Sequence, residues 1–167
     1  EQGKFESIIK LVKAGANLEE TVSDGGWKGL NPLHIAAYEG QIDSIIALKE
    51  VDANFESVVT DGSQKGLKAI HIAIEQGQVE TIEALIEGGA NPEAIINEGN
   101  WKGFNALHLA AFWGQYEVVE ALVKIGLDIE LIVSEGNWKG FNALQLAVKQ
   151  GSIEAVRTLI KVGANLE

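Results

Sequence analysis

The fold of this chain is decided by residues 31–40, which read Asn31-Pro32-Leu33-His34-Ile35-Ala36-Ala37-Tyr38-Glu39-Gly40. Asparagine is a favoured N-cap and proline is favoured at the first helical position, so a helix is predicted to begin at Pro32. Gly40 stands where a left-handed residue would end that helix. Apolar residues then recur at helical spacing from Ile42 to Leu48. The stretch therefore predicts a short helix and a second, antiparallel helix.

This helix pair recurs with a period of 37 residues. The glycine that ends the first helix recurs as Gly40, Gly77, Gly114 and Gly151. We expect a single array, 1–167, made of a partial repeat (1–14), four repeats (15–51, 52–88, 89–125 and 126–162) and a second partial repeat (163–167). Neither partial repeat would be capped, and the chain has no Met, so we expect the array to be a piece of a longer one. A second helix of the first partial repeat is expected at 4–14.

Between the helix pairs lie segments with β-forming residues and turn signals, which predict β-hairpins. One possible turn is the pair Gly99-Asn100 and its equivalents, with glycine first. The alternative is a type I turn over residues 100–103. We favour the first register because it leaves Ile95-Ile96 and Ile132-Val133 as a strand. In that register, the repeated Lys and acidic residues would pair across the two arms of one hairpin.

Residues 31–36 are close to the Thr-Pro-Leu-His-x-Ala signature, and the chain resembles the ankyrin repeat family over essentially its whole length. The resemblance implies a mostly α, right-handed solenoid of helix-turn-helix units joined by extended β-hairpin loops. The usual repeat has 33 residues, and the four extra residues here would lengthen each hairpin and deepen the groove. Asn or Lys replaces the motif Thr and Ala replaces Pro in three repeats, changes expected to weaken the helix caps.

In the resembling family, hairpin tips and first-helix ends form a concave face that binds a partner. Residues at the first-helix ends differ in chemistry from repeat to repeat, which repeat stacking alone would not require. The candidate partner-binding residues are Trp27, Tyr38, Glu39, Gln64, Glu75, Gln76, Trp101, Phe112, Trp113, Trp138 and Lys149. Two structural alternatives stay open: the tip Trp residues cover bare glycine backbone and pack on the neighbouring hairpin, and Trp113 packs against its own hairpin.

No residue pattern in the sequence indicates catalysis, a cofactor or a metal. His34, His71 and His108 recur once per repeat, and the spacing of stacked helices is too large for them to share one ion. The family resemblance implies that each His bonds within its turn and to neighbouring backbone, a role that Gln145 could also fill. The carboxylates Glu19, Glu56, Glu93 and Glu130 likewise recur once per repeat, as expected of a solvated ladder or hairpin brace.

The formal net charge of -11 argues against a nucleic acid or an anionic membrane as partner. We expect a non-catalytic module, monomeric as an isolated fragment, that binds a protein with a basic or amphipathic surface. The expected location is the cytoplasm, or the host cytoplasm if the source is an intracellular bacterium. Two other functions stay open: an architectural spacer in a larger protein, and a glycan or small-ligand site on the Trp row.

Overall fold

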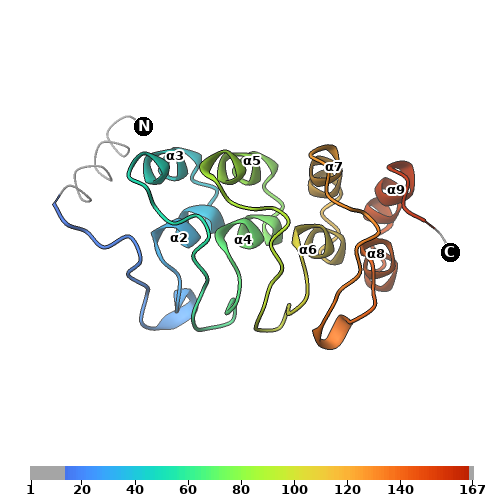
Figure 1. Cartoon of the computed structure of the whole chain (residues 1–167), viewed down its shortest axis with the longest axis horizontal. Coiled ribbons are helices and arrows are strands. Elements are labelled where there is room, and N and C mark those ends of the chain that lie inside the picture. Colours follow the sequence, from blue (N-terminus) through green and yellow to red (C-terminus); the bar gives the residue numbers. More distant parts are fainter. Residues whose placement is uncertain (1–13, 166–167) are drawn as a thin grey trace. The chain divides into compact units, whose positions relative to one another are not determined.

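A computed structural model describes residues 14–165, which contain eight α-helices in four helix-turn-helix pairs (Figure 1). The expected helix at 4–14 lies almost wholly outside the described residues, and the last partial repeat is described only as far as Asn165. The helices are α2 (Pro32–Tyr38), α3 (Ile42–Glu50), α4 (Ala69–Glu75), α5 (Val79–Gly88), α6 (Ala106–Phe112), α7 (Tyr116–Lys124), α8 (Ala143–Gln150) and α9 (Ile153–Lys161).

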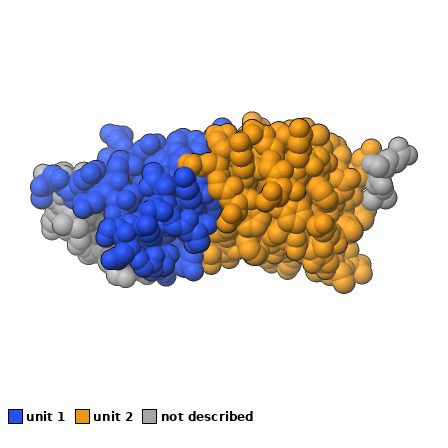
Figure 2. Space-filling model, turned by 90° about the horizontal axis from the view of Figure 1, so that it is seen from below, with its two compact units in different colours: residues 1–73, 80–91 blue, residues 74–79, 92–167 orange. Residues whose placement is uncertain are grey.

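The chain divides into two compact units, shown in separate colours in Figure 2. Unit 1 comprises residues 1–73 and 80–91, and unit 2 comprises residues 74–79 and 92–167. In unit 2 the first helices α6 and α8 pack together, and so do the second helices α7 and α9. Within each unit the loops between helix pairs project from the first helices, away from the second helices (Figure 1). We call these loops fingers, residues 18–30, 55–67, 92–104 and 129–141.

The first helices begin at well-formed caps. The Asn31 side chain accepts a hydrogen bond from the backbone N–H of His34 at 3.0 Å, and the His34 ring accepts one from the Asn31 N–H. Asn105 and Asn142 cap α6 and α8 in the same way. The expectation that Asn weakens the cap was wrong, because the Asn carbonyl reaches the same backbone N–H that the motif Thr would reach.

The core lies mainly around these first helices. In α6, residues 106–111 are all buried, which explains why the motif is rich in Ala and Leu on every side of the helix. The second helices bury one face only, as in α7, where Val118, Val119 and Leu122 are buried. The finger therefore projects from the more rigidly packed of the two helix layers.

Each finger closes with a turn that neither sequence register anticipated. Lys28 (φ -53°, ψ 129°) and Gly29 (φ 82°) occupy the central positions of a type II turn, closed by a 3.0 Å bond from the Leu30 N–H to the Trp27 carbonyl. The N–H groups of Gly29 and Val22 donate to the carbonyls of Val22 and Leu30, so two residues of the second arm oppose one of the first. This arrangement is a glycine bulge.

The expected strands are also absent from the described residues, which contain two isolated antiparallel bridges in place of a ladder. Ile132 bridges Asn142, and Val58 bridges Lys68. The bulge uses the backbone groups nearest the turn, so a single bridge forms in each of these two fingers. A short 3-10 turn, Gly25–Trp27 in the first finger and Gly136–Trp138 in the fourth, places the Trp at the tip.

Candidate functional site

In three of the four repeats, a contact joins the finger tip to the end of the first helix that follows it. Trp27 meets Tyr38 edge to face, with ring centroids 4.9 Å apart. Trp101 meets Phe112 in the same manner at 4.8 Å. In the fourth repeat the ammonium group of Lys149 lies 5.3 Å from the Trp138 ring centroid. The structure thus brings predicted site residues together as matched pairs.

In unit 2 the pairs merge into one group of rings, which we call the aromatic cluster: Trp101, Phe104, Phe112, Trp113, Trp138 and Phe141. Phe112 lies at its centre, with centroids 5.4 Å from Trp113 and 5.2 Å from Trp138. Phe104 is fully buried beneath it, whereas Trp113 is 45% exposed. Edge-to-face ring pairs hold such a group rigid.

The two structural alternatives for the Trp residues both describe real contacts. Trp138 packs on the preceding repeat through Phe104 and Phe112, and Trp113 packs on Trp101 of its own finger at 5.5 Å. Neither contact buries the rings, since Trp101 and Trp138 are partly exposed and Trp113 is half exposed. These three Trp side chains are therefore packed against other rings and still partly exposed to solvent.

The remaining predicted site residues differ in their exposure. Glu39 and Gln76 are exposed, and so is Lys149, whereas Gln64 and Glu75 are half-buried. Phe104 and Phe141 belong to the cluster but were not singled out from the sequence. A signal for them exists, because the position after the turn glycine is Leu30 and Leu67 in the first two repeats and Phe in the last two.

Within the described residues, the finger-tip lysines Lys28 and Lys102 pair with acids of the neighbouring finger, so the pairing expected across the two arms of one hairpin was wrong for them. Lys28 Nζ lies 2.7 Å from an Asp61 carboxylate oxygen, and Lys102 Nζ lies 2.8 Å from Glu135. The bond from Lys28 is the main reason why the pKa of Asp61 is lowered. Both pairs are about half exposed, so they fix the spacing of the finger tips more than they stabilise the fold.

The motif histidines are structural. His34 Nδ1 accepts a bond from the Asn31 N–H, so its Nε2 carries the proton and donates to the Ser57 carbonyl of the next finger at 3.1 Å. His108 donates to the Leu131 carbonyl in the same way at 2.8 Å. Burial lowers the pKa of His34 to about 4, against a smaller opposite effect of the Ser57 bond. The role that the family resemblance implies for the motif His is thus confirmed for these two residues.

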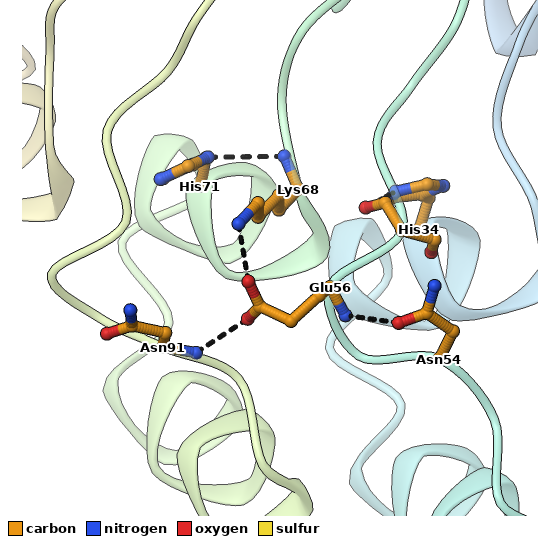
Figure 3. Close-up of polar contacts among 7 residues, drawn as sticks. His34, Asn54, Glu56, Lys68, His71 and Asn91 are labelled. Atoms are coloured by element: carbon orange, nitrogen blue, oxygen red, sulfur yellow. Dashed lines mark hydrogen bonds and ion pairs between the residues drawn. The ribbon is translucent and has the colours of Figure 1, made fainter.

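A carboxylate braces each of several fingers, as expected. Glu56 Oε1 accepts a 2.8 Å bond from the Asn91 backbone N–H, and Oε2 forms an ion pair with Lys68 (Figure 3). Burial alone would raise the pKa of Glu56, but the bonds from Lys68 and Asn91 outweigh it and the pKa is lowered. In the fourth finger, Glu130 accepts from the Asn165 N–H at 2.7 Å. Both carboxylates thus accept hydrogen bonds from backbone N–H groups within the protein.

Comparison with protein families agrees with this geometry. A family model of ankyrin repeats in three copies matches residues 1–96 and 56–133, and a model of the single ankyrin repeat matches residues 139–167. The chain belongs to the ankyrin repeat family. No curated protein matches it. Ankyrin repeats are generally protein-interaction modules.

One groove, with a volume of about 500 Å³, opens on α8 and α9 of the last ankyrin repeat in unit 2. Its floor includes Leu144, Val148 and Val156. The residues one repeat earlier, Leu107, Ala111 and Val119, are buried in the layer of α6 and α7 that packs against α8 and α9. We therefore assign the groove to the stacking surface of the ankyrin repeat and not to a ligand site.

Across residues 14–165, no three His, Asp or Glu side chains are grouped so that they could hold a metal ion. No helix in the same range is long and apolar enough to cross a bilayer.

Proposed function

We propose that this ankyrin chain is a non-catalytic recognition module that binds a protein partner on its finger tips and first-helix ends. The observation that carries the proposal is the aromatic cluster of unit 2, where a tryptophan that is 45% exposed lies on a rigid base of five other rings. Aromatic anchors of this kind, partly exposed in the free protein and held in one geometry, are typical of interface hot spots.

The variation between repeats supports the same proposal. The first-helix end is Tyr38 in one repeat, Glu75 in the next, and then Phe112 and Lys149. Stacking of identical repeats does not require such variety, because apolar residues are buried at equivalent positions of every first helix. A partner that contacts several repeats would meet a different side chain on each repeat.

Unit 1 carries a smaller version of the same surface. Trp27 and Tyr38 meet at 4.9 Å, Tyr38 is 37% exposed, and the next residue is the exposed Glu39. With a formal net charge of -11, the molecule attracts a basic or amphipathic partner over long range. We propose that this aromatic pair takes an apolar side chain of the partner, with basic residues alongside.

The test is a selection from a displayed library of random peptides on the wild-type chain, followed by affinity measurements on variants. Trp113→Ala should weaken selected peptides by about tenfold or more, as for a hot spot that loses ~1.4 kcal/mol or more. Tyr116→Ala is the matched control, because Tyr116 is 41% exposed in the same unit but lies on the second-helix layer. It should leave the peptide affinity unchanged.

Phe112→Ala is a poorer test, because Phe112 is in contact with Trp101, Trp113 and Trp138 and its removal would disturb all three rings. Trp113 is the better choice because its ring is half exposed and contacts Trp101 and Phe112, so its truncation should lower the unfolding midpoint less than that of Phe112. Peptides that bind Trp113→Ala as tightly as wild type would overturn the assignment of the site.

A further inference from the structure

The tryptophans at the finger tips keep their indole N–H groups free of bonds to the protein. Within residues 14–165, Nε1 of Trp27, Trp101 and Trp138 forms no hydrogen bond, and none of the three nitrogen atoms is buried. The fingers that follow Trp27 and Trp101 are both described, and neither supplies an acceptor. The free N–H is therefore shared by these tips wherever they lie in the array, and an acceptor from outside the chain can bond to each of them.

Two of these donors lie one repeat apart on the aromatic cluster of unit 2. The ring centroid of Phe112 lies 4.8 Å from that of Trp101 and 5.2 Å from that of Trp138. The two Trp rings are therefore no more than about 10 Å apart, in keeping with the roughly 8 to 10 Å between packed helices such as α6 and α8. A ligand that bonds to both donors must offer acceptors at about that spacing.

An extended peptide backbone offers acceptors at this spacing in one of its two regular forms. In polyproline II, which has about three residues per turn and a rise of ~3.1 Å per residue, carbonyls on one side recur every ~9.3 Å. In a β-strand, alternate carbonyls lie on one side, so they recur every ~6.6 Å, and the next but one at ~13 Å. The spacing of Trp101 and Trp138 fits the first form and neither of the strand distances.

We propose that unit 2 binds a proline-rich segment of its partner in the polyproline II conformation, and that carbonyls three residues apart accept hydrogen bonds from Trp101 and Trp138. The inference rests on the proposed function of the aromatic cluster. The pyrrolidine rings of the segment pack on Phe112 and Trp113, since proline-rich segments dock on aromatic surfaces. Carbonyls of polyproline II have no partner within their own helix, so an indole N–H replaces only water.

Both sides of this contact are ordered before they meet. Edge-to-face contacts hold the rings of the cluster, and proline fixes the φ angle of the ligand backbone. Little conformational entropy is therefore lost on binding. The net charge of -11 attracts Lys or Arg residues beside the prolines over long range, which agrees with the basic partner proposed above.

The direct test is an NMR titration of the isotope-labelled chain with an oligoproline peptide. The four Trp residues of the chain give four indole N–H signals, which are assigned by the variants Trp27→Phe, Trp101→Phe, Trp113→Phe and Trp138→Phe. The signals of Trp101 and Trp138 should move downfield and saturate, because their N–H groups form new hydrogen bonds. A Gly-Ser peptide of the same length has flexible backbone carbonyls and is the matched control ligand. It should cause much smaller shifts at the same concentration.

Replacing Trp by Phe at a finger tip keeps an aromatic ring and removes the donor. Trp101→Phe and Trp138→Phe should each weaken oligoproline binding about fivefold, the factor that corresponds to ~1 kcal/mol for a neutral hydrogen bond. Trp27→Phe makes the same change in unit 1 and should leave the response of the Trp101 and Trp138 signals unchanged. The unfolding midpoint shows whether each variant is folded. If one is not, the titration of the wild-type chain still tests both bonds.

The outcomes separate this inference from the proposed function. Peptides from the library that depend on Trp113 should be rich in proline and should bind Trp101→Phe and Trp138→Phe less tightly than wild type. Trp113-dependent peptides without proline, or oligoproline that fails to move both indole signals at about 1 mM, would overturn the polyproline II inference and leave the proposed binding site in place. If no selected peptide depends on Trp113, the binding site is wrong and the inference falls with it.

Discussion

At the scale of single residues, the motif histidine works only in its neutral form. His34 Nδ1 accepts a hydrogen bond from the Asn31 N–H at 3.2 Å, while Nε2–H donates to the Ser57 carbonyl. A proton on Nδ1 would bring two donors together in a site where the residue is 1% exposed. Burial is the cause that lowers the pKa of His34 to about 4.

The free energy of unfolding should therefore decrease as the pH is lowered, over a range set by the pKa values of His34 in the folded and unfolded chain. The unfolded chain takes up a proton on His34 near pH 6.5, whereas the folded chain does so only near pH 4. The contribution of neutral His34 to the free energy of unfolding is complete above pH 6.5. It is lost as the pH falls towards 4, and the loss is up to about 3 kcal/mol for this shift. Urea denaturation at several pH values measures the loss.

His34→Gln serves as the control, because Gln145 makes the same capping bond in the fourth repeat, accepting from the Asn142 N–H at 3.1 Å. The variant should lose less stability than wild type between pH 6.5 and 4, although carboxylates such as Glu56 titrate in both. An identical pH dependence in the two proteins would mean that His34 does not titrate as its burial requires.

At the scale of elements, the finger is shaped by glycines that touch the next finger. A Cβ on Gly103 would lie 2.6 Å from the Glu135 carbonyl oxygen and 2.8 Å from its nitrogen. Gly103 and Gly140 occupy the same turn position, with φ values of 87° and 90°, but a Cβ on Gly140 would meet nothing within 4 Å. The two sites thus separate backbone strain from contact between fingers.

Gly140→Ala should cost about 1 to 2 kcal/mol of stability, the cost of placing a side chain in a left-handed conformation. Gly103→Ala should cost roughly 1 to 3 kcal/mol more, because the backbone of Glu135 must also move. Urea denaturation of both variants measures the difference. Equal losses would show that the fingers can separate freely, contrary to the close approach at Gly103.

Helices were predictable from the sequence because their signals are local. The cap at Asn31 and the ends at Gly40 and its equivalents lie within a few residues of the helices that they bound, and the predicted helices match α2 to α9. The turn of the finger was predicted wrongly, because each finger contains more than one glycine that could close it. Gly99 and Gly103 both have positive φ, and local turn preferences do not say which of them closes the two arms.

The candidate site was predictable in part for the same reason. The sequence placed the finger-tip Trp residues and the first-helix ends on one face, and the structure brings Trp101 to Phe112 and Trp138 to Lys149. Phe104 and Phe141 were missed because they follow the turn glycine, a place that the wrong register assigned to a strand arm. Contacts between repeats, such as that of Phe112 with Trp138, could not be predicted from the sequence alone, because they depend on the distance between stacked repeats.

At the scale of the molecule, charge is distributed unevenly along the chain. Helix α5, most of which lies in unit 1, carries Glu80, Glu83 and Glu87 and no Lys or Arg. The equivalent of Glu83 in unit 2 is Glu120, which lies 3.5 Å from Lys124 and 3.9 Å from Lys161. On its own helix Glu83 thus has like charges three and four residues away, whereas Glu120 lies beside two cations.

Reversing the charge at these two equivalent positions should have opposite effects. Glu83→Lys turns two like-charge pairs on α5 into attractive pairs and should stabilise the chain by about 0.5 to 1 kcal/mol. Glu120→Lys should destabilise it by a similar amount, because it places a third cation beside Lys124 and Lys161. Lys and Glu have similar helix propensities, so electrostatics dominates both changes.

Salt provides the control for this last pair of variants. Between about 0.01 M and 1 M NaCl the Debye length falls from about 30 Å to about 3 Å, so both differences should shrink towards zero. Urea denaturation at the two salt concentrations measures them. If Glu83→Lys and Glu120→Lys shifted stability in the same direction, or kept their full effects in 1 M salt, local charge would not govern these helices.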